Sequence, residues 1–339
     1  PLEDGRQYPH LVRSDDGAKT FGPPVEIGRD GPDGAVLTSM RMHNLFVAPD
    51  GDLFASWLDD RAWISAYQRE LAAGMKKPEL DKLDYIGQLR VARSSDGGRS
   101  FAGSTLVEQP VCGCCGTRVA QGKDGPVFAT TRSEWAELKG SVDAVRDIFV
   151  AASNDDGASW SKPVKVADDG FKISGCPDIT PGLAVGAKGR LHAAWYTGKD
   201  GGPGVYYAVS DDDGKTFSKP LALLTDEWVP YGDVKLALDE LDNAWVAFED
   251  RRGDEDLIVV LRIGPDGAIS PRESWPGTGP DITAIRGSAL VTYGAYPQQE
   301  GEDYSYYKNG GVVRAVLVSA GAGGVNFTRG PAAHSGEQA

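Results

Sequence analysis

The chain has 339 residues and is acidic, because 35 lysine and arginine residues against 49 aspartate and glutamate residues give a formal net charge of −14. This charge disfavours nucleic acid and anionic membranes as partners, since binding to either relies on cationic surface. No apolar run approaches the roughly 20 residues of a membrane-spanning helix, so we expect no membrane insertion. The 44 glycines and 21 prolines predict many turns, and therefore many short strands, in a single all-β domain over residues 1–339.

Taken in chain order, short apolar segments form hairpins separated by polar turns. Residues 10–28 supply the outer strands of one unit, whose inner strands are missing or come from the C-terminus. The clearest inner hairpin is Leu45–Val47, a Pro-Asp-Gly-Asp turn and Leu53–Trp57. Similar hairpins are predicted at 117–131, 182–196, 234–249 and 281–294. A long insertion at 62–86 contains a predicted short helix over Ile64–Ala73, and further long insertions lie at 132–146 and 295–311.

An octapeptide recurs four times along the chain. It reads Ser-Asp-Asp-Gly-Ala-Lys-Thr-Phe at its first occurrence, and its copies begin at residues 14, 94, 153 and 210. In each copy an aspartate can accept hydrogen bonds from turn amides, while glycine supplies a left-handed residue. These aspartates are Asp16, Asp96, Asp155 and Asp212. The last three copies lie about 57 to 59 residues apart, a spacing that suits one four-stranded propeller blade per repeat.

These octapeptides resemble the Asp-box (BNR) repeats of sialidases and related β-propellers. The resemblance implies an all-β propeller of four-stranded blades. Five inner hairpins and the outer strands at 10–28 predict six blades, with five as the alternative. The resemblance also implies that the Asp boxes are structural turns on the face opposite the usual functional opening. The loops that enter the inner strands and the long insertions would then surround that opening.

The loops that enter the inner strands carry all four cysteines of the chain. When the turn glycines of three hairpins are aligned, Cys112 and Cys176 occupy equivalent positions, and Met40 falls on Cys114. Neighbouring blades bring such positions together around one mouth. The predicted metal ligands are Met40, Met42, His43, Cys112, Cys114, Cys115 and Cys176.

Three interpretations of this cluster remain open. Soft thiolate, thioether and imidazole donors suit copper, in particular Cu(I), or tetrahedral zinc if thiolates dominate. Zinc is the weaker expectation, since Cys-x-Cys-Cys lacks the two-residue gap of common zinc knuckles. Alternatively, Cys176 forms a disulfide with one cysteine of the 112–115 segment in an oxidising compartment, or all four are buried thiols. We interpret Pro1 as the start of a mature chain whose signal peptide has been removed, and expect a secreted or periplasmic protein.

The segment Met40–Leu45, followed later by Asp59-Asp60-Arg61, is similar to the start of sialidases. In that resemblance Arg41 takes the place of the first arginine that binds the substrate carboxylate. A sialidase further needs two more arginines, a tyrosine nucleophile paired with a glutamate, and an aspartate acid/base. Most of these positions are not matched, so we expect no sialidase activity. The weak catalytic candidates are Arg41, Asp84 and Tyr293, and the ligand-binding candidates are Arg41, Arg61 and Arg118.

The sequence therefore predicts a sialidase-like propeller that binds a metal, with copper as the first expectation, through a Cys/Met/His cluster at the channel mouth. One alternative is a glycan-binding propeller, or a glycoside hydrolase of sialidase type, that uses Arg41 and nearby carboxylates. A further alternative is a protein-interaction scaffold with structural disulfides. The expected partner at the mouth is accordingly a small molecule, a glycan or a protein.

Overall fold

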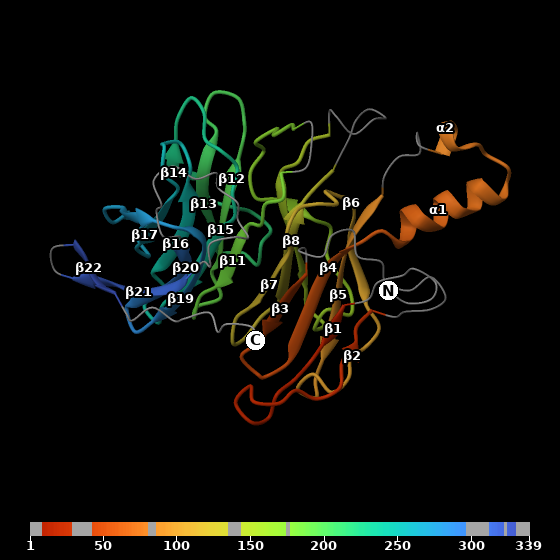
Figure 1. Cartoon of the computed structure of the whole chain (residues 1–339), viewed down its shortest axis with the longest axis horizontal. Coiled ribbons are helices and arrows are strands. Elements are labelled where there is room, and N and C mark those ends of the chain that lie inside the picture. Colours follow the sequence, from red (N-terminus) through yellow and green to blue (C-terminus); the bar gives the residue numbers. More distant parts are fainter. Residues whose placement is uncertain are drawn as a thin grey trace.

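The computed structural model describes residues 9–28, 43–80, 86–134, 144–173, 177–295, 312–321 and 324–329. Within these ranges the chain forms five four-stranded sheets and one two-stranded sheet. The helices found there are α1 (Arg61–Ala72) and α2 (Lys77–Leu80), which project away from the sheets as an arm (Figure 1). The predicted all-β class and the predicted helical insertion at 62–86 are both confirmed. No helix of the described ranges is long and apolar enough to cross a membrane.

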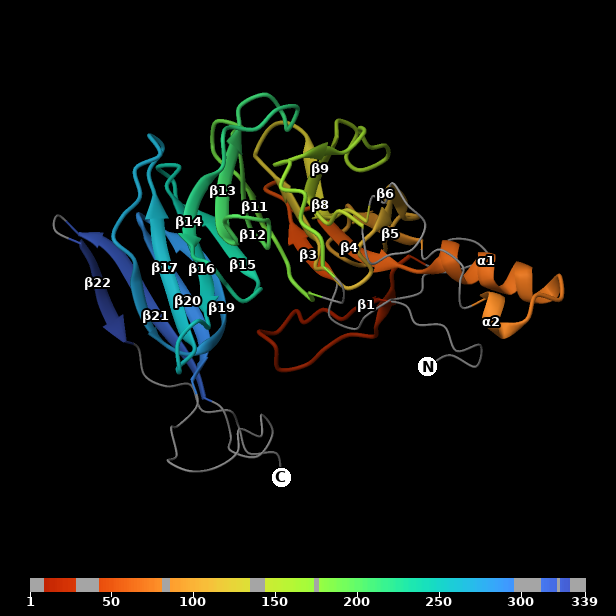
Figure 2. The same cartoon turned by 90° about the horizontal axis from the view of Figure 1, so that it is seen from above.

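Each large sheet consists of four consecutive antiparallel strands, which is the construction of a propeller blade. In Figure 2 these sheets follow one another in chain order, from orange to blue. The first sheet contains β3 (Asn44–Val47), β4 (Leu53–Asp59), β5 (Gly87–Ser94) and β6 (Thr105–Val111). The second contains β7 (Arg118–Gln121), β8 (Val127–Arg132), β9 (Ile148–Ser153) and β10 (Val164–Lys165). The third contains β11 (Gly182–Val185), β12 (Leu191–Thr197), β13 (Gly204–Ser210) and β14 (Leu221–Thr225). The fourth contains β15 (Val234–Leu238), β16 (Ala244–Asp250), β17 (Leu257–Ile263) and β18 (Glu273–Pro276), and the fifth contains β19 (Thr278–Ile285), β20 (Ser288–Ala295), β21 (Val312–Gly321) and β22 (Gly324–Arg329).

The N-terminal segment forms only a two-stranded sheet. β1 (His10–Leu11) and β2 (Val25–Glu26) pair antiparallel on either side of the first octapeptide, as predicted for residues 10–28. The described C-terminal strands β21 and β22 complete the sheet that begins with β19, so they supply no inner strands for β1 and β2. Six blades, with five as the alternative, therefore stays a prediction.

In the first four large sheets the second strand is buried on both faces, whereas β20 of the fifth sheet alternates between buried and half-buried residues. Alternate residues of a strand point to opposite faces. In β12, Trp195 accordingly belongs to the apolar cluster shared with the second sheet, while Tyr196 belongs to the cluster shared with the fourth. Trp57, Trp195 and Trp245 occupy β4, β12 and β16 and are fully buried. Each indole removes roughly 150–250 Å² from water, so these side chains are major contributors to the core.

The four octapeptides form the same turn. In the copy at 210–217, the Thr216 amide and hydroxyl donate to the Asp212 carboxylate at 2.9 and 2.7 Å, and the Gly214 amide donates to Ser210 Oγ at 2.9 Å. Equivalent hydrogen bonds occur in the other three copies. In the large sheets these turns join the third strand to the fourth, at the strand ends opposite the loops that enter the inner strands.

The first strands of all five large sheets line one cavity of about 600 Å³. Its walls are formed by residues of β3, β7, β11, β15 and β19. Because every inner strand contributes, this cavity is the central channel of the propeller, and we call it the channel below.

Candidate functional site

A pocket of about 470 Å³ lies where the loops before β11 and β15 meet the first residues of β19 at one end of the channel. We call it the mouth pocket. Its lining consists of residues 177–180, 231–233, Lys235, Glu249, Arg251 and 279–281. Lys235 and Asp281 line both the mouth pocket and the channel, so the two cavities are continuous.

The mouth pocket carries more acidic than basic groups. Its carboxylates are Asp178, Asp233, Glu249 and Asp281, and its basic side chains are Lys235 and Arg251. Both basic groups are engaged by neighbouring carboxylates. Lys235 Nζ lies 3.2 Å from Asp233 Oδ2, and Arg251 Nε lies 3.4 Å from Glu249 Oε2. The pocket therefore offers mostly hydrogen-bond acceptors to a ligand.

Backbone amides hold two of these carboxylates in place. The Thr180 amide donates to Asp233 Oδ1 at 2.7 Å, across 53 positions of sequence. The Gly279 amide donates to Glu249 Oε1, which ties the start of the fifth sheet to the end of β16. The Arg251 guanidinium in turn donates to the carbonyl of Tyr231. Hydrogen bonds thus connect the lining residues of three sheets, so the pocket is preformed.

Arg118 begins β7 and lines the channel. Burial lowers the pKa of its guanidinium, and the opposing carboxylates of Asp233 and Asp281 partly restore it. Arg118 donates to the neighbouring Thr117 carbonyl at 3.0 Å. The structure thus places one of the three arginines predicted to bind ligand in the channel wall, within the electrostatic reach of two pocket carboxylates.

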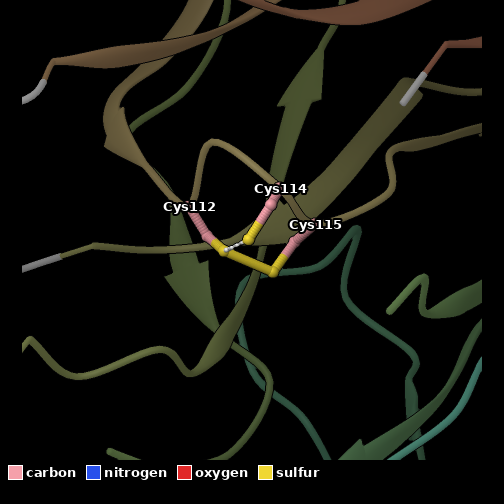
Figure 3. Close-up of side chains that lie close together, drawn as sticks. All are labelled: Cys112, Cys114 and Cys115. Carbon is pink, nitrogen blue, oxygen red and sulfur yellow. Dashed lines mark hydrogen bonds between the residues drawn. A yellow bond between two sulfur atoms is a disulfide. The ribbon is translucent and has the colours of Figure 1, made fainter. Parts of the chain in front are cut away.

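Three cysteines come together in the loop between β6 and β7, residues 112–117, which we call the cysteine loop. Cys112 and Cys115 form a disulfide, and Cys112 Sγ lies 3.8 Å from Cys114 Sγ (Figure 3). All three sulfurs lie within 4.8 Å of one another. Cys112 and Cys115 are fully buried, and no cysteine of the described residues is a free thiol.

The sequence did not predict a disulfide within the cysteine loop, and the expected bond of Cys176 to one member of the 112–115 segment stays a prediction. Here the chain turns back on itself, with the Cys115 amide 3.4 Å from the Cys112 carbonyl. This turn brings the Cα atoms of Cys112 and Cys115 to 5.6 Å, within the usual range for a disulfide. Cys176 lies outside the described residues.

The sulfur of Cys112 faces a buried cation. Arg146 Nη1 donates to Cys112 Sγ at 3.2 Å, and Arg146 Nη2 donates to Glu134 Oε1 at 3.3 Å. Arg132 lies nearby, since its carbonyl accepts the Cys112 amide at 3.0 Å. Burial lowers the pKa of the Arg132 guanidinium to about 10, so it stays charged at neutral pH. The Nε atoms of Arg132 and Arg146 are buried and have no hydrogen-bond partner among the described residues.

Several predicted site residues have other roles or lie elsewhere. Arg61 makes a two-bonded ion pair with the buried Asp59, at 2.9 Å for both contacts, and Arg252 pairs in the same way with Asp250 in the fourth sheet. Tyr293 is buried against Trp275, with ring centroids 5.6 Å apart. His43 is exposed and does not belong to the cysteine grouping. Met40, Arg41, Met42 and Asp84 lie outside the described residues.

Neither the acidic lining of the mouth pocket nor the two residues beside Cys112, Arg146 and Glu134, are predicted from the sequence. A signal for the lining exists, because the tetrapeptide Pro-Asp-Ile-Thr occurs at both 177–180 and 280–283. The structure places the aspartates of both copies in the mouth pocket. No comparable pattern in the sequence points to Arg146 or Glu134.

Comparison with solved structures identifies the architecture as that of sialidase and arabinanase β-propellers. An α-L-arabinanase of Penicillium chrysogenum, complexed with arabinobiose, matches at 16% identity over 87% of this chain and 82% of its own, with a TM-score of 0.51. The NanB sialidase of Streptococcus pneumoniae matches at 12% identity over 89% of this chain, with a TM-score of 0.52, and this chain spans 62% of that protein. An intramolecular trans-sialidase of Ruminococcus gnavus, complexed with oseltamivir carboxylate, matches at 12% identity over 85% of this chain and 83% of its own, with a TM-score of 0.50.

These likenesses establish a β-propeller fold. No protein-family model matches the chain, and no curated protein sequence does either. At 12 to 16% identity, similarity to these structures establishes the fold of this chain but not its function.

Proposed function

We propose that the protein binds a neutral carbohydrate in the mouth pocket. The observation that carries this proposal is the lining itself, in which four carboxylates and two basic side chains surround about 470 Å³. Carboxylate oxygens accept hydrogen bonds from sugar hydroxyls, and the lysine and arginine donate to hydroxyl and ring oxygens. A pocket of this size with a few convergent polar groups is typical of a small-molecule site.

The charge of the lining favours a neutral sugar over sialic acid. A sialic acid carboxylate would enter a pocket with twice as many acidic as basic side chains, where Lys235 and Arg251 already pair with Asp233 and Glu249. Like charges in a partly enclosed site repel. Arabino-oligosaccharides are the first neutral probes, because the arabinanase with a similar fold was solved with arabinobiose.

Hydrolysis is a natural extension of such binding. Glycoside hydrolases act through two carboxyl groups on either side of the scissile bond, and the mouth pocket has four carboxylates, two from loops and two from the strands β16 and β19. Release of reducing sugar is therefore measured together with binding. We expect no release of sialic acid, since the lining is acidic and Arg61 already forms an ion pair with Asp59.

Titration calorimetry with arabinobiose, longer arabino-oligosaccharides, galacto-oligosaccharides and 3′-sialyllactose tests the proposal. We expect heat of binding from at least one neutral oligosaccharide and none from sialyllactose. Asp281→Asn and Glu249→Gln should each weaken binding about tenfold, the loss of one charge-assisted hydrogen bond. Glu227→Gln, an exposed glutamate outside the pocket, is the matched control and should leave binding unchanged. Binding of sialyllactose alone, or of no oligosaccharide, would contradict the proposal.

We also propose that the protein works in a secreted or periplasmic setting. The Cys112–Cys115 disulfide supports this, because disulfides persist in oxidising compartments and are rare in the reducing cytosol. Thiol labelling of intact cells of the native host, followed by lysis and fractionation, tests the location. Recovery of the protein from the cytosolic fraction with its cysteines reduced would contradict it.

A further inference from the structure

We infer that Trp228 and Tyr231 form an aromatic platform beside the mouth pocket, on which further units of a neutral oligosaccharide stack. The inference rests on the proposed binding of carbohydrate in the mouth pocket, and it adds a preference for a chain longer than the pocket alone can hold. The carrying observation is the exposure of two large aromatic side chains at this place. Trp228 is 65% exposed and Tyr231 is 45% exposed.

The exposure of Trp228 sets it apart from the other tryptophans. In the part of the chain that the structure describes, every other tryptophan is buried or half-buried. An indole that stays in water gains nothing from the hydrophobic effect until another molecule covers it. Large exposed aromatic side chains therefore mark surfaces that bind a ligand or a partner.

The loop that carries both rings runs from the edge of the propeller to the channel. This loop, residues 226–233, joins β14, the outermost strand of the third sheet, to β15, which lines the channel. Tyr231 lies in the inner part of the loop and lines the mouth pocket. Trp228 precedes it by three positions, so their Cα atoms are at most about 10 Å apart. An oligosaccharide that leaves the pocket over Tyr231 can therefore continue outward over Trp228.

The loop is anchored through its backbone between the two rings. The side chain of Val229 is buried, and its carbonyl accepts a hydrogen bond from the buried Tyr196 hydroxyl at 2.9 Å. The Tyr231 carbonyl accepts a hydrogen bond from the Arg251 guanidinium. A preformed loop loses little conformational freedom when a ligand binds. Because both anchors use carbonyl oxygens, replacing the ring of Trp228 or Tyr231 leaves these hydrogen bonds in place.

The chemistry of the platform suits a sugar chain. The face of an aromatic ring carries partial negative charge, and the C–H groups on the face of a sugar ring carry partial positive charge and are apolar. Stacking of the two faces leaves the sugar hydroxyls at the edges, where carboxylates of the mouth pocket accept hydrogen bonds. Aromatic rings next to hydrogen-bond acceptors thus match both kinds of surface that an oligosaccharide presents.

The test compares short and long neutral oligosaccharides on the whole protein. Calorimetry is run with arabino- and galacto-oligosaccharides of two and of six units. We expect six units to bind about tenfold more tightly than two, because only the longer chain covers Trp228. Trp228→Ala should remove this gain and leave the affinity for two units unchanged, whereas Trp228→Phe should keep most of it. Tyr231→Ala should weaken the binding of both lengths, since Tyr231 lines the pocket.

Tryptophan fluorescence gives a second measurement. Six units, but not two, should protect the protein from quenching by acrylamide, and this protection should be absent in Trp228→Phe. Leu241→Ala is the matched control. Leu241 is 70% exposed and lies in the turn between β15 and β16, at the end of β15 away from the loop 226–233. This variant should change neither the affinities nor the quenching.

The outcomes separate the platform from the proposed function. Binding of two units without a gain for six, or a gain that persists in Trp228→Ala, would overturn the platform and leave the mouth pocket as the binding site. A protein that binds no neutral oligosaccharide of either length would overturn both proposals. Protection from quenching by 3′-sialyllactose alone would also overturn the inference, because the platform would then serve an anionic glycan.

Discussion

The Gly116 amide donates to the Ile179 carbonyl at 2.9 Å, so the cysteine loop is bonded directly to the segment that forms one wall of the mouth pocket. The next residue, Thr180, donates its own amide to Asp233 Oδ1. The contact is close, because a Cβ atom on Gly116 would lie 1.9 Å from Thr180 Oγ1. The cysteine loop and this wall of the pocket, bonded between positions 116 and 179, are therefore one structural unit.

Gly116→Ala should disturb both the fold and the pocket. The added methyl group overlaps Thr180, whose displacement breaks the amide contact with Asp233. We expect a loss of about 1–3 kcal/mol in the free energy of unfolding, together with weaker carbohydrate binding. Chemical denaturation and calorimetry measure the two effects. Gly253→Ala, where a Cβ meets nothing within 4 Å, is the control and should change neither quantity.

The cysteines should be almost fully oxidised in the isolated protein. Since none of the three described cysteines is a free thiol, we expect at most one reactive thiol per unfolded, unreduced chain of four cysteines. Thiol titration in denaturant counts them, and non-reducing peptide mapping should find the Cys112–Cys115 bond. If the predicted disulfide of Cys176 to the 112–115 segment forms, Cys114 is its remaining partner there. Two or more reactive thiols would contradict this assignment.

Stability should fall in acid because of the octapeptide turns. Hydrogen bonds lower the pKa of Asp155 and Asp212 from 3.8 to about 2. The largest effect comes from the Ser159 hydroxyl for Asp155 and from the Thr216 hydroxyl for Asp212. Each carboxylate therefore stabilises the folded state above pH 4, and this contribution is lost as the pH falls through the folded value of about 2. Unfolding midpoints measured from pH 5 to pH 2 should decrease, and less steeply in Asp212→Asn than in Asp254→Asn. An equal slope for the two variants would count against the turn as the cause.

His192 should add a second, separate dependence on pH. Burial, with a smaller effect from Arg190, lowers its pKa from 6.5 to about 4. Between these values the unfolded chain binds a proton that the folded chain does not, so stability decreases as the pH falls from 6.5 toward 4 and levels off below.

His192→Gln should remove that decrease, which denaturant titrations at several pH values will measure. In wild type, side-chain NMR should find the ring neutral at about pH 5.5. His10→Gln is the control, since His10 is exposed beside Glu26. A ring that titrates near 6.5 would show that His192 is hydrated in solution.

The local parts of this protein follow from sequence alone. The octapeptide turns close on themselves, because Asp212 accepts its hydrogen bonds from residues within four positions. The hairpins depend on alternating apolar residues and on a short polar turn. The grouping of Cys112, Cys114 and Cys115 also follows, since they occupy one short loop. Such features need no information about distant residues.

Tertiary structure alone decided the chemistry of the two sites. Asp233 meets Thr180, and Arg146 meets Cys112, across 53 and 34 positions of sequence. These contacts depend on how neighbouring sheets approach, which is set by side-chain packing over whole faces and not by any short pattern. Arg61 and Arg118 make the same point, because the sequence marks both as ligand-binding candidates. In the structure Arg61 forms an ion pair with Asp59, and Arg118 lines the channel. Which carboxylate lies near each guanidinium is determined only when the sheets pack.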